Sequence, residues 1–215
     1  MIELLNMDCM EYMKGLEDNA FDLAIVDPPY GIGESKDNES RNRVASNNYK
    51  AKEWDNTAPD SGYFDQLRRV SKNQIIWGAN HFIDNFPFMC NSPCWIAWDK
   101  ENGASDFADI ELAYSSFKTA ARLFRYRWAG MLQGDMKNKE YRIHPTQKPV
   151  KLYEWLLKNY AKEGDKILDT HLGSGSSAIA AHYSGFDFVG CELDEDYYDA
   201  AIERFNNETK QAAMF

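Results

Sequence analysis

Three short stretches of the chain combine chemically useful side chains with bends that would expose them. The first is Asp27-Pro28-Pro29-Tyr30, which follows the apolar run at 22–27. Consecutive prolines lack backbone donors and stiffen the turn, so nearby carbonyl oxygens stay free to accept hydrogen bonds. A carboxylate, free carbonyls and an aromatic ring together suit the amino group of an unstacked base. A rigid turn capping a strand is the simpler alternative, but it leaves Tyr30 unexplained.

The second stretch is a glycine bend at 169–176, between an apolar run and the start of a helix. Gly173 and Gly175 would let the backbone approach a ligand closely, and a helix N-terminus favours negative charge. A later apolar run, 186–192, ends in Glu192, where an acid can accept from ribose hydroxyls. No GK[ST] follows the bend, which excludes a P-loop. Another phosphate-binding nucleotide fold stays open.

The third stretch is 144–149, HPTQKP, immediately before a helix predicted to begin near Val150. Thr146 and Gln147 could donate to a carboxylate from a turn held between two prolines. The helix end adds its dipole to such a site. A structural turn would explain the prolines but not the cluster of donors.

Apolar runs of strand length alternate with amphipathic stretches, which favours an α/β fold with a mainly parallel, twisted sheet and helices on both faces. The predicted strands are 22–27, 73–78, 94–99, 166–170 and 186–192. One helix is expected within 148–164, and a final helix over about 195–206 follows the cap candidate Asp194. Ligands of such sheets bind at the carboxyl ends of the strands, where the first two stretches lie.

The length of 215 residues, with 44% hydrophobic and 27% charged, predicts a single domain over 1–215. Residues 1–20 contain no uninterrupted apolar core, so we expect neither a signal peptide nor a membrane anchor, and a cytoplasmic protein. No CxxC pair is present. Cys90 and Cys94 with His81 lack a fourth ligand, so no metal site is expected.

The net charge of −10 argues against a polyanionic partner, but the charges are unevenly distributed. Residues 118–148 carry eight basic side chains against two acids, whereas 152–215 carry twelve acids and five bases. One face could therefore attract nucleic acid, although a solvated surface would look similar. The candidates for DNA contact are Arg122, Arg125, Arg127, Lys137, Lys139 and Arg142.

Taken together, these stretches resemble the amino-methyltransferases that act on DNA, specifically the permuted β group, in which the DPPY half precedes the cofactor half. Segments 71–82 and 95–117 look like the small phage-encoded adenine methylases of that group. The resemblance covers nearly the whole chain. It implies a Rossmann-like methyltransferase fold in circularly permuted order, S-adenosylmethionine as cofactor, and methyl transfer to N6 of a flipped adenine in double-stranded DNA.

The resemblance also implies roles for single residues. Asp27 and the Pro28 carbonyl would accept the two hydrogens of the adenine amine, Pro29 would complete the motif, and Tyr30 would stack on the base. The cofactor would be held by Asp8 at its adenine, Glu192 at its ribose, Asp169, Gly173, Gly175 and Ser176 at its methionine part, and Thr146 and Lys148 near its amino-acid end. The usual Asp-Pro-Phe of the bend reads 169–171 Asp-Thr-His here. We expect His171 to pack or contact rather than act as a base, because the transfer needs none.

Three further segments receive hypotheses. The interval 101–142 carries the basic excess and is predicted to be a target-recognition insertion. The polar stretch 31–62 lacks any period and is expected to close over the flipped base. The tail 208–215 is expected to be flexible. Its residues Gln211, Met214 and Phe215 resemble peptides that dock on the bacterial sliding clamp, with a frayed terminus as the alternative.

Several alternatives stay open at this point. Cytosine N4 methylation uses similar geometry, although Ser commonly replaces Asp27 in such enzymes. An RNA or protein-amide methylase fits less well, and a catalytically idle DNA- or clamp-binding accessory protein would not need intact motifs. The sequence leaves open the recognition site, a restriction partner and whether the chain forms a homodimer.

Overall fold

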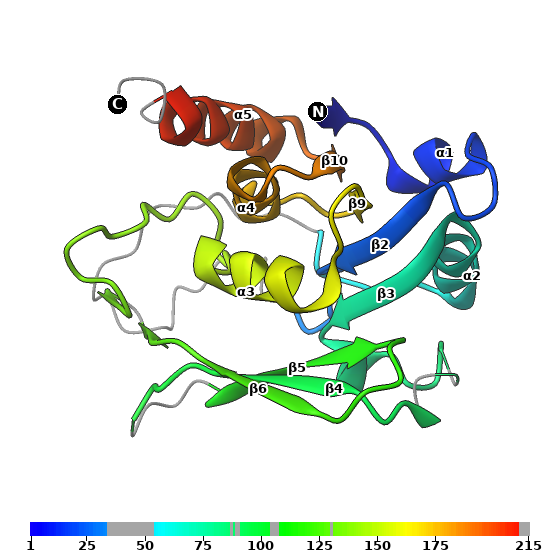
Figure 1. The fold of residues 1–215 in the computed structure, drawn as a ribbon, viewed down its shortest axis with the longest axis horizontal. Coiled ribbons are helices and arrows are strands. Elements are labelled where there is room, and N and C mark those ends of the chain that lie inside the picture. Colours follow the sequence, from blue (N-terminus) through cyan, green and yellow to red (C-terminus); the bar gives the residue numbers. More distant parts are fainter. Residues whose placement is uncertain (34–53, 87, 89–90, 104–107, 130, 211–215) are drawn as a thin grey trace.

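The computed structural model describes residues 1–33, 54–86, 88, 91–103, 108–129 and 131–210, which form an eight-stranded sheet with helices on both faces (Figure 1). Its strands are β1 Ile2–Asn6, β2 Phe21–Val26, β3 Ser71–Trp77, β4 Trp95–Asp99, β5 Ile110–Ser115, β6 Arg122–Arg125, β9 Lys166–Asp169 and β10 Asp187–Glu192. The helices are α1 Cys9–Lys14, α2 Ser61–Val70, the 3-10 turn η1 Ala79–His81, α3 Val150–Tyr160, α4 Ser176–Ser184 and α5 Glu195–Lys210. A separate pair is β7 Trp128–Ala129 with β8 Leu132–Gln133.

The sheet order is β1-β10-β9-β2-β3-β5-β4-β6. The first five strands run parallel, β5 is antiparallel to both of its neighbours, and β6 is parallel to β4. The prediction of a mainly parallel α/β fold is confirmed. The sequence pattern missed β1, β5 and β6, because these short strands include charged and half-exposed positions instead of a continuous apolar run.

Central strands are apolar on both faces because helices cover both. On β2, Leu23 and Ile25 belong to one buried cluster, which includes side chains of α3 and α4. Ala24 and Val26 point to the other face and pack in a cluster with α2. Figure 1 shows this division, with α3, α4 and α5 on one side of the sheet and α1 and α2 on the other.

The functional edge lies where the chain direction across the sheet reverses. Strands β9 and β2 are parallel neighbours, but β9 leads on to β10 on one side and β2 leads on to β3 on the other. Such a switch point leaves a crevice at the carboxyl ends of the two strands. Asp27 directly follows β2, and Asp169 ends β9, so the two predicted motifs emerge side by side.

Two predicted boundaries need correction. Helix α5 continues to Lys210, with Asp194 accepting from the Tyr197 amide at its start (3.1 Å). The tail predicted at 208–215 therefore begins too early, and 211–215 lies outside the described residues. The interval 101–142 is also not wholly an insertion, because it supplies β5 and β6 to the central sheet. Among the described residues of this interval, 110–115 and 122–125 belong to the central sheet.

Within the described ranges, no helix has the length and apolar character needed to cross a membrane. The same residues contain no group of three or more His, Cys, Asp or Glu side chains placed to hold a metal ion. Cys90, considered above with Cys94 and His81, falls outside the ranges that the structure describes.

Candidate active site

A cavity of about 660 Å³ opens at the carboxyl edge of the sheet. It brings together seven of the predicted site residues from five separate parts of the chain: Asp8, Asp27, Pro29, Thr146, Lys148, Gly173 and Glu192. Pro28, Tyr30, Asp169, Gly175 and Ser176 are not among the described residues that line it. Trp54, Pro59 and Asp60 add a wall from the end of the polar stretch 31–62.

The glycine bend is shaped by left-handed backbone and held by Glu192. Gly173 has φ 53° and Gly175, which precedes α4, has φ 74°, conformations that glycine adopts without steric cost. The Glu192 carboxylate accepts from the Gly173 amide (2.9 Å) and from the Asp194 amide (3.0 Å). Burial raises the pKa of Glu192, and these two amides oppose that rise. The predicted ribose acceptor therefore also fixes the bend.

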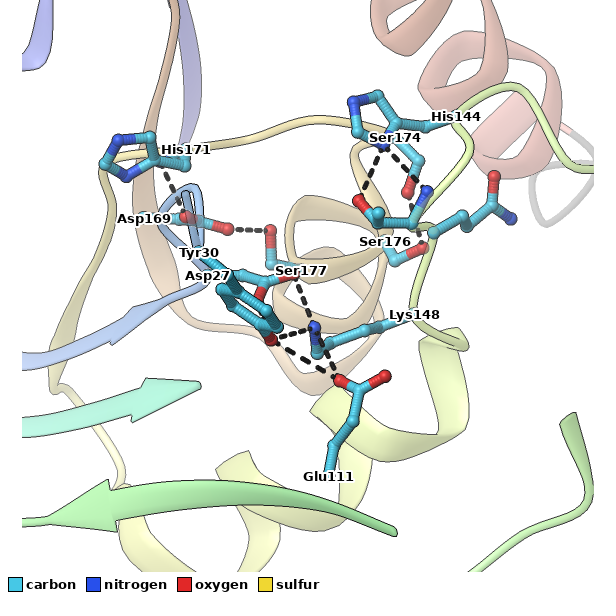
Figure 2. Close-up of polar contacts among 12 residues, drawn as sticks. Asp27, Tyr30, Glu111, His144, Lys148, Asp169, His171, Ser174, Ser176 and Ser177 are labelled. Atoms are coloured by element: carbon cyan, nitrogen blue, oxygen red, sulfur yellow. Dashed lines mark hydrogen bonds and ion pairs between the residues drawn. The ribbon is translucent and has the colours of Figure 1, made fainter. Parts of the chain in front are cut away.

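Asp169 connects the glycine bend to the start of α4 through its carboxylate. Its buried carboxylate accepts from the His171 amide (3.0 Å) and from the Ser177 hydroxyl (2.6 Å), as Figure 2 shows. Both donors are uncharged. Burial consequently raises the pKa of Asp169 to about 7 despite these hydrogen bonds.

His171 and Asp8 line the cavity while making local contacts of their own. Burial lowers the pKa of His171 to about 4, so its ring is neutral near pH 7, and its Nδ1 lies 2.9 Å from the Thr170 hydroxyl. The Asp8 carboxylate caps α1 by accepting from the Met10 amide (2.6 Å) and the Glu11 amide (3.2 Å). Both amides donate to the same oxygen, Asp8 Oδ1, which leaves Oδ2 able to accept from another donor.

The stretch 27–30 belongs to a compact group of polar and charged side chains, here named the Asp27 corner: Asp27, Tyr30, Lys148 and Glu111 (Figure 2). The Lys148 ammonium lies 2.6 Å from Asp27 Oδ2, 2.9 Å from Glu111 Oε2 and 3.1 Å from the Tyr30 hydroxyl. The Tyr30 hydroxyl donates to Asp27 Oδ1 (2.8 Å). Glu111, on β5, forms a second ion pair with Lys100 at the end of β4.

Burial and charge act against each other in this corner. Burial raises the pKa of Asp27, and the Lys148 cation opposes it. Burial would lower the pKa of Lys148, but Asp27 and Glu111 reverse that effect and raise it. Burial would raise the pKa of Glu111, but Lys148 and Lys100 lower it to about 2. Asp27, Lys148, Glu111 and Lys100 alternate in sign along the chain of ion pairs, so these four charges together are close to neutral.

Tyr30 occupies a position prepared by a glycine. A Cβ built on Gly78, which follows β3 and has φ 67°, would lie 2.1 Å from Cε1 of the Tyr30 ring. The ring is nearly parallel to His81, with centroids 5.0 Å apart and 16° between the planes. In this structure, His81 is thus the stacking partner of Tyr30, which was expected to receive the base.

The segment 144–149 divides its side chains between the cavity and the Asp27 corner. Thr146 is exposed, with its hydroxyl 3.1 Å from His144 Nδ1. The Gln147 amide bonds the backbone of Tyr141 and Ile143, which uses the donor that was expected to meet a ligand. Lys148, expected near the amino-acid end of a cofactor, instead points at Asp27.

The basic candidates are mostly on the surface. Arg122 and Arg125 lie on β6, and Arg125 contacts Asp99 (3.3 Å). Five of the six are exposed: Arg122, Arg125, Arg127, Lys137 and Lys139. Arg142 differs, because it is half-buried with its guanidinium 4.5 Å from the centre of the Trp128 ring.

Sequence reasoning missed four residues that hold this site together: Lys100, Glu111, Gly78 and Arg204. Arg204 is buried on α5, where it donates to the Ser174 carbonyl (2.9 Å), the Ser176 hydroxyl (2.8 Å) and Glu140 (2.8 Å). An acid within the β5 stretch IELAYS and an arginine within a helix are ordinary surface residues by pattern. They are identified by their contacts in the structure, namely the ion pairs of Glu111 and the hydrogen bonds of buried Arg204.

Comparison with known proteins finds methyltransferases among the relatives and the solved structures. Type II methyltransferase M2.MboI of Moraxella bovis is 25% identical over 94% of this chain and 86% of its own length. A solved M1.HpyAVI-SAM complex superposes with a TM-score of 0.61 at 21% identity, covering 95% of this chain and all of that one. PvuII DNA methyltransferase, which is cytosine-N4-specific, gives a TM-score of 0.61 at 13% identity, with 99% and 90% covered.

At such identities the solved structures establish the fold. The family assignment rests on a sequence model described as DNA methylase, of the N6 and N4 type, which matches residues 95–203. That match runs from β4 through the segment 144–149, the glycine bend and Glu192 into α5, and therefore covers half of the chain. The chain belongs to this family of DNA methylases.

Proposed function

We propose that this methylase transfers a methyl group from S-adenosylmethionine to N6 of an adenine that has been flipped out of double-stranded DNA. The observation that carries the proposal is the Asp27 carboxylate, which lines the same cavity as the glycine bend and Glu192. A carboxylate at that place can hold an amine, and the bend can hold a nucleoside with a charged amino-acid arm.

The cavity fits the proposed cofactor. Its volume of about 660 Å³ lies within the usual range for small-molecule sites, and its lining includes the acids Asp8, Asp27 and Glu192. Asp8 Oδ2 would accept from the adenine amine of the cofactor, and Glu192 would accept from its ribose. The bend at Gly173 would face the methionine part of the cofactor. S-adenosylmethionine supplies a methyl group that is already activated by a sulfonium.

The role of the protein is then to make a poor nucleophile react. The lone pair of the adenine amine is delocalised into the ring, which weakens it. Asp27 and the Pro28 carbonyl would accept the two N–H bonds and turn the lone pair out of the ring plane. Alignment and fixed electrostatics of this kind supply most of the acceleration, and no general base is needed before transfer.

The decisive variant is Asp27→Asn, which keeps the shape of the side chain but removes its charge. We expect turnover to fall by about a hundredfold or more, the size of loss seen when a single electrostatic contact to a transition state is removed. S-adenosylmethionine should still bind and stabilise the variant, by about 2.7 kcal/mol at a hundredfold excess over Kd.

Asp22→Asn is the matched control, because Asp22 lies on the same strand but pairs with Lys72 near the surface. Methylation by Asp27→Asn within tenfold of the wild type would contradict the role of Asp27. Absence of cofactor stabilisation in the wild type would favour the idle accessory protein instead.

Adenine is preferred to cytosine because the motif begins with Asp27, whereas the cytosine-N4 enzymes that the sequence resembles commonly have Ser there. The fold does not separate the two, since PvuII methyltransferase shares it. Expression in an unmethylated host, followed by sequencing that distinguishes N6-methyladenine from N4-methylcytosine, tests the choice. Modified cytosine without modified adenine would overturn it.

We propose that DNA contacts the exposed basic residues at and after β6. Neutralising Arg125, Arg127 and Lys139 together should weaken binding and lower the slope of log K against log[salt] by about 2–3, because each phosphate contact contributes about 0.9. Lys158, Lys162 and Lys210, in the acidic C-terminal part, provide the matched triple control. An equal loss in both triples would show that only net charge matters.

Contact with a sliding clamp through Gln211, Met214 and Phe215 stays a prediction, because these residues lie outside the described ranges. Deleting 211–215 should abolish clamp binding and leave methylation of short DNA duplexes unaltered. Closure of the stretch 31–62 over the base, and a homodimer, stay untested in the same way.

A further inference from the structure

The Asp27 corner contains more charge than amine binding requires. Lys148 is almost completely buried, and it contacts Asp27 Oδ2 and Glu111 Oε2 at 2.6 and 2.9 Å. A buried ion is costly unless its partners and hydrogen bonds repay the loss of water. This cluster therefore has to be explained by something other than packing.

The hydrogen bonds of the corner are complete. An ammonium has three donors, and Lys148 directs them at Asp27, Glu111 and the Tyr30 hydroxyl. Asp27 receives Lys148 on Oδ2 and Tyr30 on Oδ1, so both of its oxygens are held. The carboxylate consequently has one orientation, set by groups from two other parts of the chain.

Glu111 reaches the corner from the far side. It lies on β5, two strands from β2 in the sheet, and it contacts Lys148, Lys100 and, at 3.5 Å, the Tyr30 hydroxyl. Glu111 is not among the described residues that line the cavity. An effect of Glu111 on the reaction would therefore pass through Lys148, through the Tyr30 hydroxyl or through its charge.

We propose that Glu111 and Lys148 are positioning residues for Asp27. Lys148 holds the carboxylate ionised and fixed, and Glu111 shares the ammonium so that Asp27 keeps enough acceptor strength to hold the target amine. The proposal rests on the proposed function, in which Asp27 is the amine acceptor.

The two residues act on Asp27 with opposite sign. The Lys148 cation lowers the pKa of Asp27, and the Glu111 anion raises it. Activity that needs ionised Asp27 is lost as the pH falls through that pKa. The other titratable groups facing the corner are Tyr30 after β2, Tyr153 on α3, Asp169 at the end of β9 and Lys100 beyond Glu111.

The test is the pH profile of kcat/KM, whose limbs report groups of the free enzyme. The acid limb is the part of the profile in which kcat/KM rises with pH as Asp27 ionises. Lys148→Met should move this limb to higher pH, and Glu111→Gln should move it to lower pH, each by about half a pH unit or more. Glu111→Gln should also lower kcat by about threefold to thirtyfold, because Lys148 then neutralises Asp27 alone. KM for S-adenosylmethionine should stay within about twofold of the wild type.

Two further variants separate charge from folding. The double variant Glu111→Gln/Lys148→Met removes both charges, so it avoids two buried acids facing each other, and its acid limb should lie between those of the single variants. Glu111→Asp keeps the charge and should restore the wild-type limb. Lys151→Met, in an exposed pair with Glu154 on α3, is the matched control and should leave the profile unchanged.

An acid limb that stays in place in both single variants, or moves in the same direction in both, overturns the proposal. If the acid limb did not move, the titrating group would be Asp169. Its pKa is raised to about 7, and neither Glu111 nor Lys148 is among the causes of that rise. Failure of the proposed function looks different, because Asp27→Asn would then keep its activity.

Discussion

The Asp27 corner and the glycine bend both contain buried or half-buried carboxylates at adjacent strand ends, but they hold them in different ways. Among the described residues, the donors to Asp169 and Glu192 are uncharged, namely backbone amides and the Ser177 hydroxyl. Asp27 is paired with a buried cation that is itself shared with Glu111. Hydrogen bonds from amides fix backbone, whereas a charge pair fixes the ionisation of a side chain.

This difference separates the two tasks of the site. Under the proposed function, the bend has to keep its shape to receive a cofactor, and its acids are bonded to backbone amides of the bend. The corner would have to present charge to an amine, and we propose that Lys148 keeps its acid ionised for this purpose. Variants of the two regions should therefore fail in different measurements.

The largest expected effect is at the bend, through Arg204→Met. Losing the guanidinium leaves Glu140 buried without its cation and frees the Ser174 carbonyl, which should lower the free energy of unfolding by about 3–5 kcal/mol. Urea denaturation measures the loss, and Lys72→Met, in the exposed pair with Asp22, should change little. If the variant also shifted the acid limb assigned to Asp27, the two regions would not be separable.

A smaller effect is expected at the corner from Gly78→Ala. The new Cβ would collide with the Tyr30 ring and sit at positive φ, which should cost about 1–3 kcal/mol and displace the Tyr30 hydroxyl from Asp27. Turnover should fall more than cofactor affinity. Gly164→Ala is the matched control, since its φ is 85° but nothing lies within 4 Å of the added atom. Equal losses of activity in both variants would show that backbone strain alone is responsible.

The smallest effect concerns the charge of Asp169. Its folded pKa of about 7 lies above the ordinary value of 3.8, so its stabilising contribution is complete below pH 3.8 and is lost as the pH rises through 7. Asp169→Asn has no such loss, and its Oδ1 can still accept from the His171 amide. Between about pH 5 and pH 7, the free energy of unfolding of the wild type should fall relative to that of the variant by on the order of 1–2 kcal/mol. A constant difference across that range would mean that Asp169 is ionised throughout.

The sequence alone determined the fold class, the Asp27–Tyr30 motif, the glycine bend, and the edge of the sheet at which these two motifs meet. Asp27 follows an apolar run and Gly173 lies in a bend before a helix, and such local patterns depend on neighbours in the chain. Helices α3 and α5 were also predictable, because the spacing in 148–164 and the cap at Asp194 are local signals, whereas α1 and α2 were not predicted. The strands β1, β5 and β6 were not, since their pairing partners rather than their own pattern stabilise them.

Only the tertiary structure decided which side chains meet Asp27. Lys148 is 121 positions away in the chain and was expected at the cofactor, and Glu111 carried no signal of a role. Their pairing depends on the order of strands in the sheet, which places β5 beside β3, and on the packing of the 144–149 segment, which brings Lys148 to Asp27 at the end of β2. The reason is physical: a motif specifies local backbone and side-chain type, whereas the charge balance of a buried group depends on every element that packs around it.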